Sequence, residues 1–214
     1  MPLAAMVLAV ALQAPPSSSP CGAPRRVRLL PVDQAASQPG FFAFRARLQT
    51  AIARRDEAAL LAAVDPGIRL SFGVDNGIDE LRRLLRDPQG TLWADLAATL
   101  ALGGTFQSPT TFVAPYVFST WPSGADSFEC AAILGERVRV RRTETADSPV
   151  VASVSFEVVQ VLRDPRDGTP VQVRVANRVT GFVAPAFVRS PIDKRASFEK
   201  IGGLWRLRSF VAGD

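Results

Sequence analysis

The N-terminal half of the chain carries the hydrophobic spacing of helices. Phe44, Leu48 and Ile52 recur every four residues and fall on one face of a predicted helix that starts at Phe41. Asp56 follows that helix and is placed to cap a second, shorter one. Residue pairs that contain Pro or Gly then separate further segments in which apolar residues recur with helical spacing. The four predicted helices cover residues 41–55, 57–64, 78–85 and 92–102.

The C-terminal half alternates apolar and polar residues with the two-residue period of strands. Gly202-Gly203 separates the last two strands and is the strongest hairpin signal in the chain. One predicted strand, 68–72, lies among the helices, and the others cover residues 111–120, 137–142, 150–155, 157–162, 171–176, 182–187, 196–201 and 204–211. Helices followed by strands predict an α+β fold with a mostly antiparallel β region.

The N-terminus resembles a signal peptide over residues 1–14. Leu3 to Leu12 is an unbroken apolar run, too short to span a bilayer, and Ala-Leu-Gln-Ala ends it with the small-x-small pattern of a cleavage site. The alternative is that the start codon is misassigned and that the apolar run is a strand. Residues 15–40 are rich in Pro, Ser, Gln and Gly and predict a linker or tail. With no later apolar run of membrane length, the sequence predicts a periplasmic or secreted protein without a membrane span.

Two cysteines invite one disulfide in an exported protein. A bond from Cys21 to Cys130 would tie the N-terminal tail to the body of the protein. The alternative is a free Cys130 buried in a strand beside an unstructured Cys21. The sequence leaves both interpretations open.

Composition excludes several kinds of chemistry. The 214 residues contain no histidine, which excludes Ser-His-Asp and Cys-His hydrolysis and His-ligated zinc. The formal net charge is +5, but the arginines are scattered among 20 acidic residues without a long basic run. That scatter argues against nucleic acid as the partner. No cofactor, metal site or catalytic residue is predicted.

Residues 137–188 resemble a bacterial SH3-like (SH3b) domain. In that family a strand ending in Asn-Val-Arg opens the domain, and a Gly-Trp-Val segment follows the last turn. Here Val140-Arg141 and Gly181-Phe182-Val183 occupy those positions, with Arg139 in place of the Asn and Phe182 in place of the Trp. The resemblance implies a small barrel over residues 137–193 that recognises peptide or peptidoglycan.

The flanking regions, 41–136 and 194–214, are similar to an NTF2-like cone. Members of that family pack N-terminal helices on a curved sheet whose last strand carries a Gly-x-Trp signature, which Gly203-Leu204-Trp205 matches. The resemblance implies a sheet and helix layer into which the SH3-like barrel is inserted, or to which it is appended. In this division, residues 194–214 form a C-terminal β-hairpin.

One strand and three aromatic residues supply the candidate binding surface. Arginines alternate with Val138 and Val140, so they lie on one face of the strand, where guanidinium groups can bind carboxylates or phosphates. The alternative is a solvated face that discourages pairing at a sheet edge. The candidate ligand-binding residues are Tyr116, Trp121, Arg137, Arg139, Arg141 and Phe182.

These features predict an exported, non-enzymatic binding or scaffolding protein of the bacterial cell envelope. Its partner would be a cell-wall polymer, a peptide or a protein, and the sequence leaves the oligomeric state open. The alternative is an NTF2-like or acid-only enzyme with a pocket in the N-terminal region. A deep pocket with a buried acid of raised pKa would favour the enzyme, and a shallow aromatic groove would favour binding.

Overall fold

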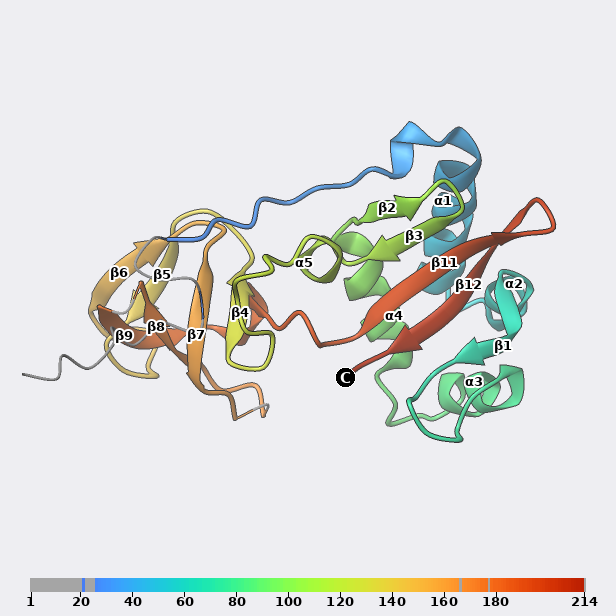
Figure 1. The fold of residues 1–214 in the computed structure, drawn as a ribbon. Helices are drawn as coiled ribbons and strands as arrows, with labels where there is room; N and C mark the ends of the chain where they lie inside the picture. The colour runs from blue at the N-terminus through green and yellow to red at the C-terminus, as the bar shows by residue number, and fades with distance from the viewer. Residues whose placement is uncertain (1–20, 22–25, 166, 177, 214) are drawn as a thin grey trace, which may run out of the picture.

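Two lobes lie side by side in the computed structural model, which describes residues 21, 26–165, 167–176 and 178–213 (Figure 1). One lobe combines a five-stranded sheet with most of the helices, and the other is built on a seven-stranded sheet. Helices precede most of the strands, so the predicted α+β class is confirmed. The predicted signal peptide lies outside the described residues.

Helices are concentrated in the first half of the chain, as the spacing predicted. Asp56 caps α2, because its side chain accepts a hydrogen bond from the backbone N–H of Ala59 at 3.0 Å. The helices are α1 (Pro39–Ala53), α2 (Glu57–Ala62), α3 (Ile78–Leu85), α4 (Leu92–Ala101) and α5 (Tyr116–Ser119), with 3-10 turns η1 (Ala35–Ser37) and η2 (Pro185–Phe187).

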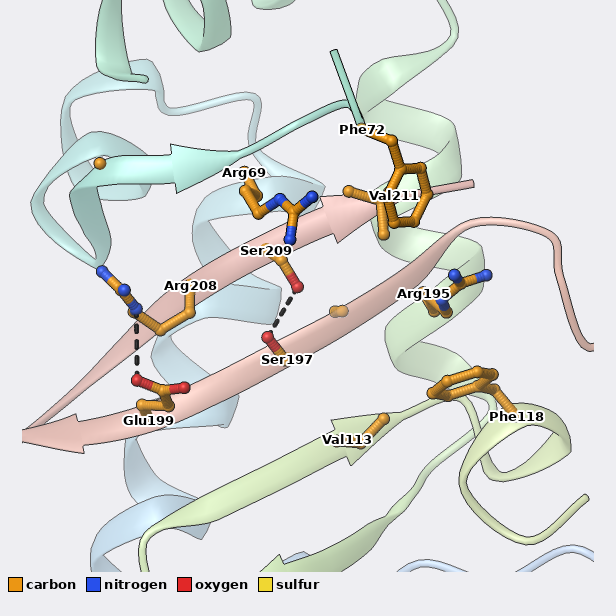
Figure 2. Close-up of a pocket in the computed structure, with 12 residues that line it drawn as sticks. Arg69, Phe72, Val113, Phe118, Arg195, Ser197, Glu199, Arg208, Ser209 and Val211 are labelled. Atoms are coloured by element: carbon orange, nitrogen blue, oxygen red, sulfur yellow. Dashed lines mark hydrogen bonds and ion pairs between the residues drawn. The ribbon is translucent and has the colours of Figure 1, made fainter. Parts of the chain in front are cut away.

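The five-stranded sheet has two different faces. One face is apolar and packs against α1 and α4, and the other carries polar side chains that include Ser197 and Ser209 (Figure 2). β1 runs parallel to β12, and the other neighbours are antiparallel. The strand order is β1 (Val64–Arg69), β12 (Leu204–Val211), β11 (Arg195–Ile201), β3 (Thr111–Ala114) and β2 (Thr105–Ser108).

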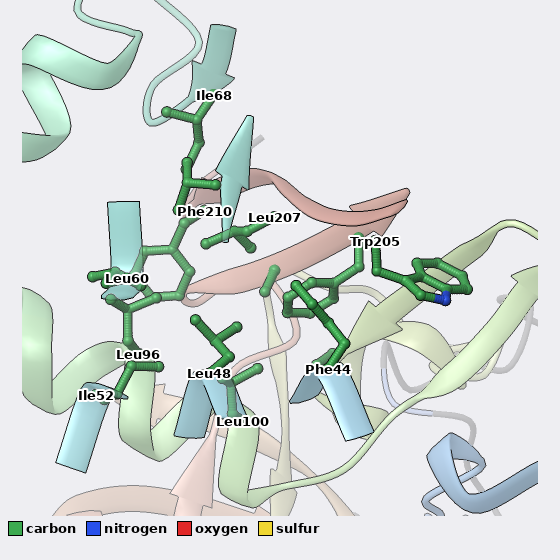
Figure 3. Packing of buried hydrophobic residues seen from close by; sticks show 14 of the residues in the cluster. Phe44, Leu48, Ile52, Leu60, Ile68, Leu96, Leu100, Trp205, Leu207 and Phe210 are labelled. Atoms are coloured by element: carbon green, nitrogen blue, oxygen red, sulfur yellow. The ribbon is translucent and has the colours of Figure 1, made fainter. Parts of the chain in front are cut away.

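The core of this lobe fills the space between the helices and the apolar face of the sheet. Figure 3 shows side chains of α1 and α4 directed toward those of β12. Phe41 is fully buried at its centre, with its ring centroid 4.3 Å from that of Phe112 and 4.8 Å from that of Trp205. Trp205 is therefore a core residue, and the apolar spacing of α1 reflects its packing against the sheet.

The second lobe contains an antiparallel sheet whose core is rich in valine. Its strand order is β10 (Val188–Arg189), β4 (Cys130–Ile133), β7 (Val158–Arg163), β8 (Val171–Val175), β9 (Val179–Val183), β5 (Val138–Arg141) and β6 (Val150–Val154). β10 and β6 stand at the two ends of this row, and no pairing between described residues closes it. The sheet therefore differs from the predicted SH3-like barrel, because β4 extends it beyond residues 137–193 through its pairing with β7.

Other segments also differ from the predicted secondary structure. The strand predicted over 182–187 ends at Val183 with β9 and is followed by the turn η2, and β2 was not predicted. The strand predicted over 111–120 ends at Ala114, because Pro115 has no N–H for a ladder and stands at the N-cap of α5. The strand predicted over 68–72 lies earlier, at Val64–Arg69. β4 is buried along its whole length, so its sequence Cys-Ala-Ala-Ile lacks the alternation that marks a half-exposed strand.

Residues 26–35, which we call the strap, contact both lobes along one edge of the molecule (Figure 1). Near its start, the N–H of Leu29 donates to the carbonyl of Phe156 at 2.7 Å in the second lobe. At its end, the N–H of Gln34 donates to the carbonyl of Gly104 at 2.9 Å in the first lobe. The segment expected to be a tail thus links the two lobes through backbone hydrogen bonds.

An ion pair anchors the end of the strap to α1. The guanidinium of Arg45 donates to both carboxylate oxygens of Asp33, at 2.8 and 2.6 Å, and Arg45 is buried. Burial raises the pKa of Asp33, but the hydrogen bonds from Arg45 and from the N–H of Ala35 outweigh it, so the pKa lies below its ordinary range. The pair therefore stabilises the fold only while Asp33 is ionised.

Replacing Asp33 by Asn should reveal this dependence. Because the folded-state pKa is lowered, the contribution is present above the unfolded-state pKa and is lost as pH falls through the folded-state value. After a discount for solvent screening at this half-exposed carboxylate, we expect Asp33→Asn to lower the free energy of unfolding by about 1 kcal/mol at pH 7. Urea unfolding at pH 7 and at roughly pH 3 measures the difference, and a gap that stays constant with pH would contradict the assignment.

Candidate functional site

Strand β5 divides its side chains between the core and the surface. Val138 and Val140 point into the valine core, whereas Arg139 is exposed and Arg141 is half-buried on the opposite face. Arg137 comes one residue before the strand, is exposed, and has a positive φ of 50°. The alternation in the sequence thus corresponds to one apolar and one basic face of the same strand.

The basic face forms one wall of an open groove, which we call the arginine groove. The hollow measures about 470 Å³, and Phe182 of β9 lines it together with the arginines of β5. Phe182 is the register partner of Arg141, which explains why residues about forty positions apart meet here. Its principal lining residues are Arg137, Arg139, Arg141, Pro170, Phe182 and Phe187.

Hydrogen bonds hold one arginine of the groove and leave two available. Arg141 donates from its guanidinium to the carbonyl of Ser148 at 2.6 Å, which fixes the direction of that side chain. No described residue forms an ion pair with Arg137 or Arg139. Glu144 also lines the groove, but its carboxylate is bound to Arg163 at 3.0 Å. Glu136 also lines the groove, so the three guanidinium groups of the groove outnumber its two carboxylates and give this surface a net positive charge.

Gly181 brings the two walls of the groove together. A Cβ atom at this position would lie 2.5 Å from the carbonyl oxygen of Arg141 and 2.7 Å from a methyl group of Val140. Only glycine allows β9 to approach β5 this closely, and Phe182 follows it directly. The Gly-Phe-Val segment that suggested an SH3-like motif is thus explained by the close packing of two strands.

Tyr116 and Trp121 lie away from the arginine groove, contrary to the expectation of a common exposed surface. Tyr116 is 1% exposed in a small core that includes Leu29 of the strap, and burial raises the pKa of its phenol. Trp121 is half-buried, and its indole N–H donates to the carbonyl of Ala125 at 2.9 Å. Tyr116 lies in α5 and Trp121 follows that helix, and neither lines the groove beside β5.

The two cysteines meet in the same small core. A disulfide joins Cys21 to Cys130, with their Cα atoms 5.7 Å apart, and Cys130 lies in the buried strand β4. The bond ties the chain ahead of the strap to the seven-stranded sheet.

No group of three or more His, Cys, Asp or Glu side chains in the described part of the chain is arranged to hold a metal ion. None of the described helices combines the length and apolar character needed to cross a membrane.

Several lining residues were missed by sequence reasoning. Pro170 and Phe187 complete the apolar side of the arginine groove, and Phe187 is 43% exposed just before β10. An exposed phenylalanine in a Pro-Ala-Phe turn indicates a candidate binding residue. The sequence does not show that it lies beside β5, because that depends on the order of the strands in the sheet.

No family model and no curated protein matches this sequence. Among solved structures, the chain is similar to a protein of unknown function with a cystatin-like fold from Nostoc punctiforme. The identity is 13%, and the match covers 84% of this chain and 92% of the other with a TM-score of 0.27, too low to assign a fold. No SH3b or NTF2-like family model matches the chain, and the seven-stranded sheet is not the predicted closed barrel, so neither family resemblance is retained.

Replacing Gly181 by Ala should separate the two walls of the groove. The added Cβ meets backbone and a valine methyl group that cannot move independently, so we expect a loss of about 1–3 kcal/mol in the free energy of unfolding. Gly124→Ala is the matched control, because a Cβ there meets nothing within 4 Å. Equal stability of the two variants in urea unfolding would show that β5 and β9 do not pack as described.

Proposed function

We propose that this protein is an exported binding protein whose arginine groove holds an anionic polymer of the cell envelope. The carrying observation is that Arg137, Arg139 and Arg141 line a single groove. Guanidinium groups match carboxylates and phosphates in shape and charge, and none of these three forms an ion pair with a described residue, although Arg141 donates to the carbonyl of Ser148.

The spacing of the arginines suits a repeating ligand. Alternate residues of a strand lie about 6.8 Å apart on the same face, so Arg139 and Arg141 present two cations in line along β5. Arg141 uses one guanidinium nitrogen to bind the carbonyl of Ser148 and keeps its other N–H donors for a ligand. A polymer with repeated charges can contact both at once, and the second contact is then intramolecular. Phe182 and Phe187 supply apolar surface for the uncharged parts of such a chain.

Export is supported by two features. The N-terminal sequence has the apolar run and cleavage pattern of a signal peptide, and the disulfide between Cys21 and Cys130 suits an oxidising compartment. A cell-wall polymer is therefore within reach of the proposed protein.

Binding is favoured over acid catalysis by the state of the carboxyl groups. A general acid at neutral pH needs a raised pKa. Among the described carboxyl groups with a shifted pKa, the shift is downward, and hydrogen bonds to the carboxylates lower each one. In the arginine groove, Glu144 accepts a hydrogen bond from Arg163 at 3.0 Å.

The proposal is tested by co-sedimentation of the protein with purified cell-wall sacculi. The double variant Arg137→Gln/Arg139→Gln should bind at least about tenfold more weakly than the wild type, since two charged contacts are lost. The matched control is Arg142→Gln/Arg178→Gln, which removes the same charge from exposed positions that do not line the groove.

Each outcome of this comparison is informative. Loss of binding in the groove variant alone supports the proposed function. Equal weakening of both variants would mean that net charge rather than the groove attracts the polymer. Absence of wild-type binding would overturn the proposed ligand.

A further inference from the structure

A second hollow lies on the polar face of the five-stranded sheet (Figure 2), in a different lobe from β5 (Figure 1). Its floor is formed by β3, β11 and β12, and it measures about 350 Å³. Phe72, which follows β1, and Phe118 of α5 stand on either side of it. We call this hollow the sheet-face pocket, and its charges and rings together indicate what it can bind.

One arginine of the pocket is neutralised and another is not. Arg208 is bound to Asp65 at 2.6 Å and to Glu199 at 3.3 Å. Arg69 lies on the neighbouring strand, is exposed, and forms no ion pair with any residue in the described part of the chain. Asp65 and Glu199 therefore neutralise Arg208, and the guanidinium of Arg69 remains available to bind a ligand.

Aromatic rings hold the guanidinium groups at the rim. The guanidinium carbon of Arg69 lies 5.3 Å from the ring centroid of Phe72, and that of Arg195 lies 5.7 Å from the same centroid. Arg195 is also 4.7 Å from the ring centroid of Phe118 and is only 9% exposed. These cation–π contacts orient the cations beside apolar surface, where a charge interaction is stronger than in open water.

The floor adds a hydrogen-bond donor. The hydroxyl oxygens of Ser197 and Ser209 lie 2.7 Å apart on adjacent strands, so one hydroxyl donates to the other. The accepting hydroxyl keeps its own proton, which is available for a ligand oxygen. Val113 and Val211 flank this pair and provide apolar contact.

We propose that the sheet-face pocket binds a small carboxylate that carries an aromatic or branched apolar body. The carboxylate lies against Arg69 and the serine pair, and the body lies against Val113 and Val211, beside the Phe72 ring. The volume is at the lower end of the range for small-molecule sites, about 300–1,000 Å³, which fits a compact molecule. This site is independent of the arginine groove and of the polymer proposed for it.

An NMR titration with phenylacetate tests the proposal on the full chain. We expect saturable binding with a Kd of about 1 mM or tighter, and shifts of the backbone amides of Ser197 and Ser209. Phenethylamine has the same ring with a cationic head and should bind at least about tenfold more weakly. Inorganic phosphate, an anion without an apolar body, should also bind at least about tenfold more weakly than phenylacetate.

Arg69→Gln should weaken phenylacetate binding about tenfold or more, because the unpaired guanidinium is lost. Arg54→Gln is the control, since Arg54 is exposed and does not line the pocket. Undiminished binding by Arg69→Gln, or no saturable binding by the wild type, would overturn the proposal. Phosphate binding as tight as phenylacetate would also overturn it, because the apolar body would then contribute nothing.

Discussion

The strap is the constraint on which the arrangement of the two lobes depends. Backbone hydrogen bonds from Leu29 and Gln34 connect the strap to both lobes, and Asp33 binds the buried guanidinium of Arg45. A disulfide from Cys21 fixes the chain ahead of it to β4. The strap therefore joins the two lobes, although its composition is typical of a linker. Its conformation is fixed by contacts with residues far away in the sequence.

Much of the secondary structure could be predicted because its signals are local. The side chain of Asp56 caps α2 within its own turn, and Gly202 and Gly203 adopt positive φ values of 57° and 84° in the β11–β12 hairpin. The split of β5 into valine and arginine faces follows directly from the two-residue period. The three groove arginines were therefore identifiable without knowledge of the strand order, whereas Phe182 was named only through the SH3-like motif.

The rest depends on contacts between distant segments. β4 has no alternation because both of its faces are buried, and Tyr116 is buried because α5 turns it toward the strap. The Gly181 motif suggested a family, whereas its physical cause is the close approach of β9 to β5. The sheet-face pocket joins Arg69 to Arg195 across more than a hundred residues, and periodicity alone does not encode such a meeting.

The proposed function places the envelope polymer in the arginine groove. Hydrogen–deuterium exchange of the protein, with and without soluble cell-wall fragments, tests it most directly because it locates the contact without any substitution. If the polymer binds in the arginine groove, exchange should be slower in residues 137–144 and 182–187, which contain the two walls of the groove. Protection confined to other segments, with these two unchanged, would contradict the proposed function.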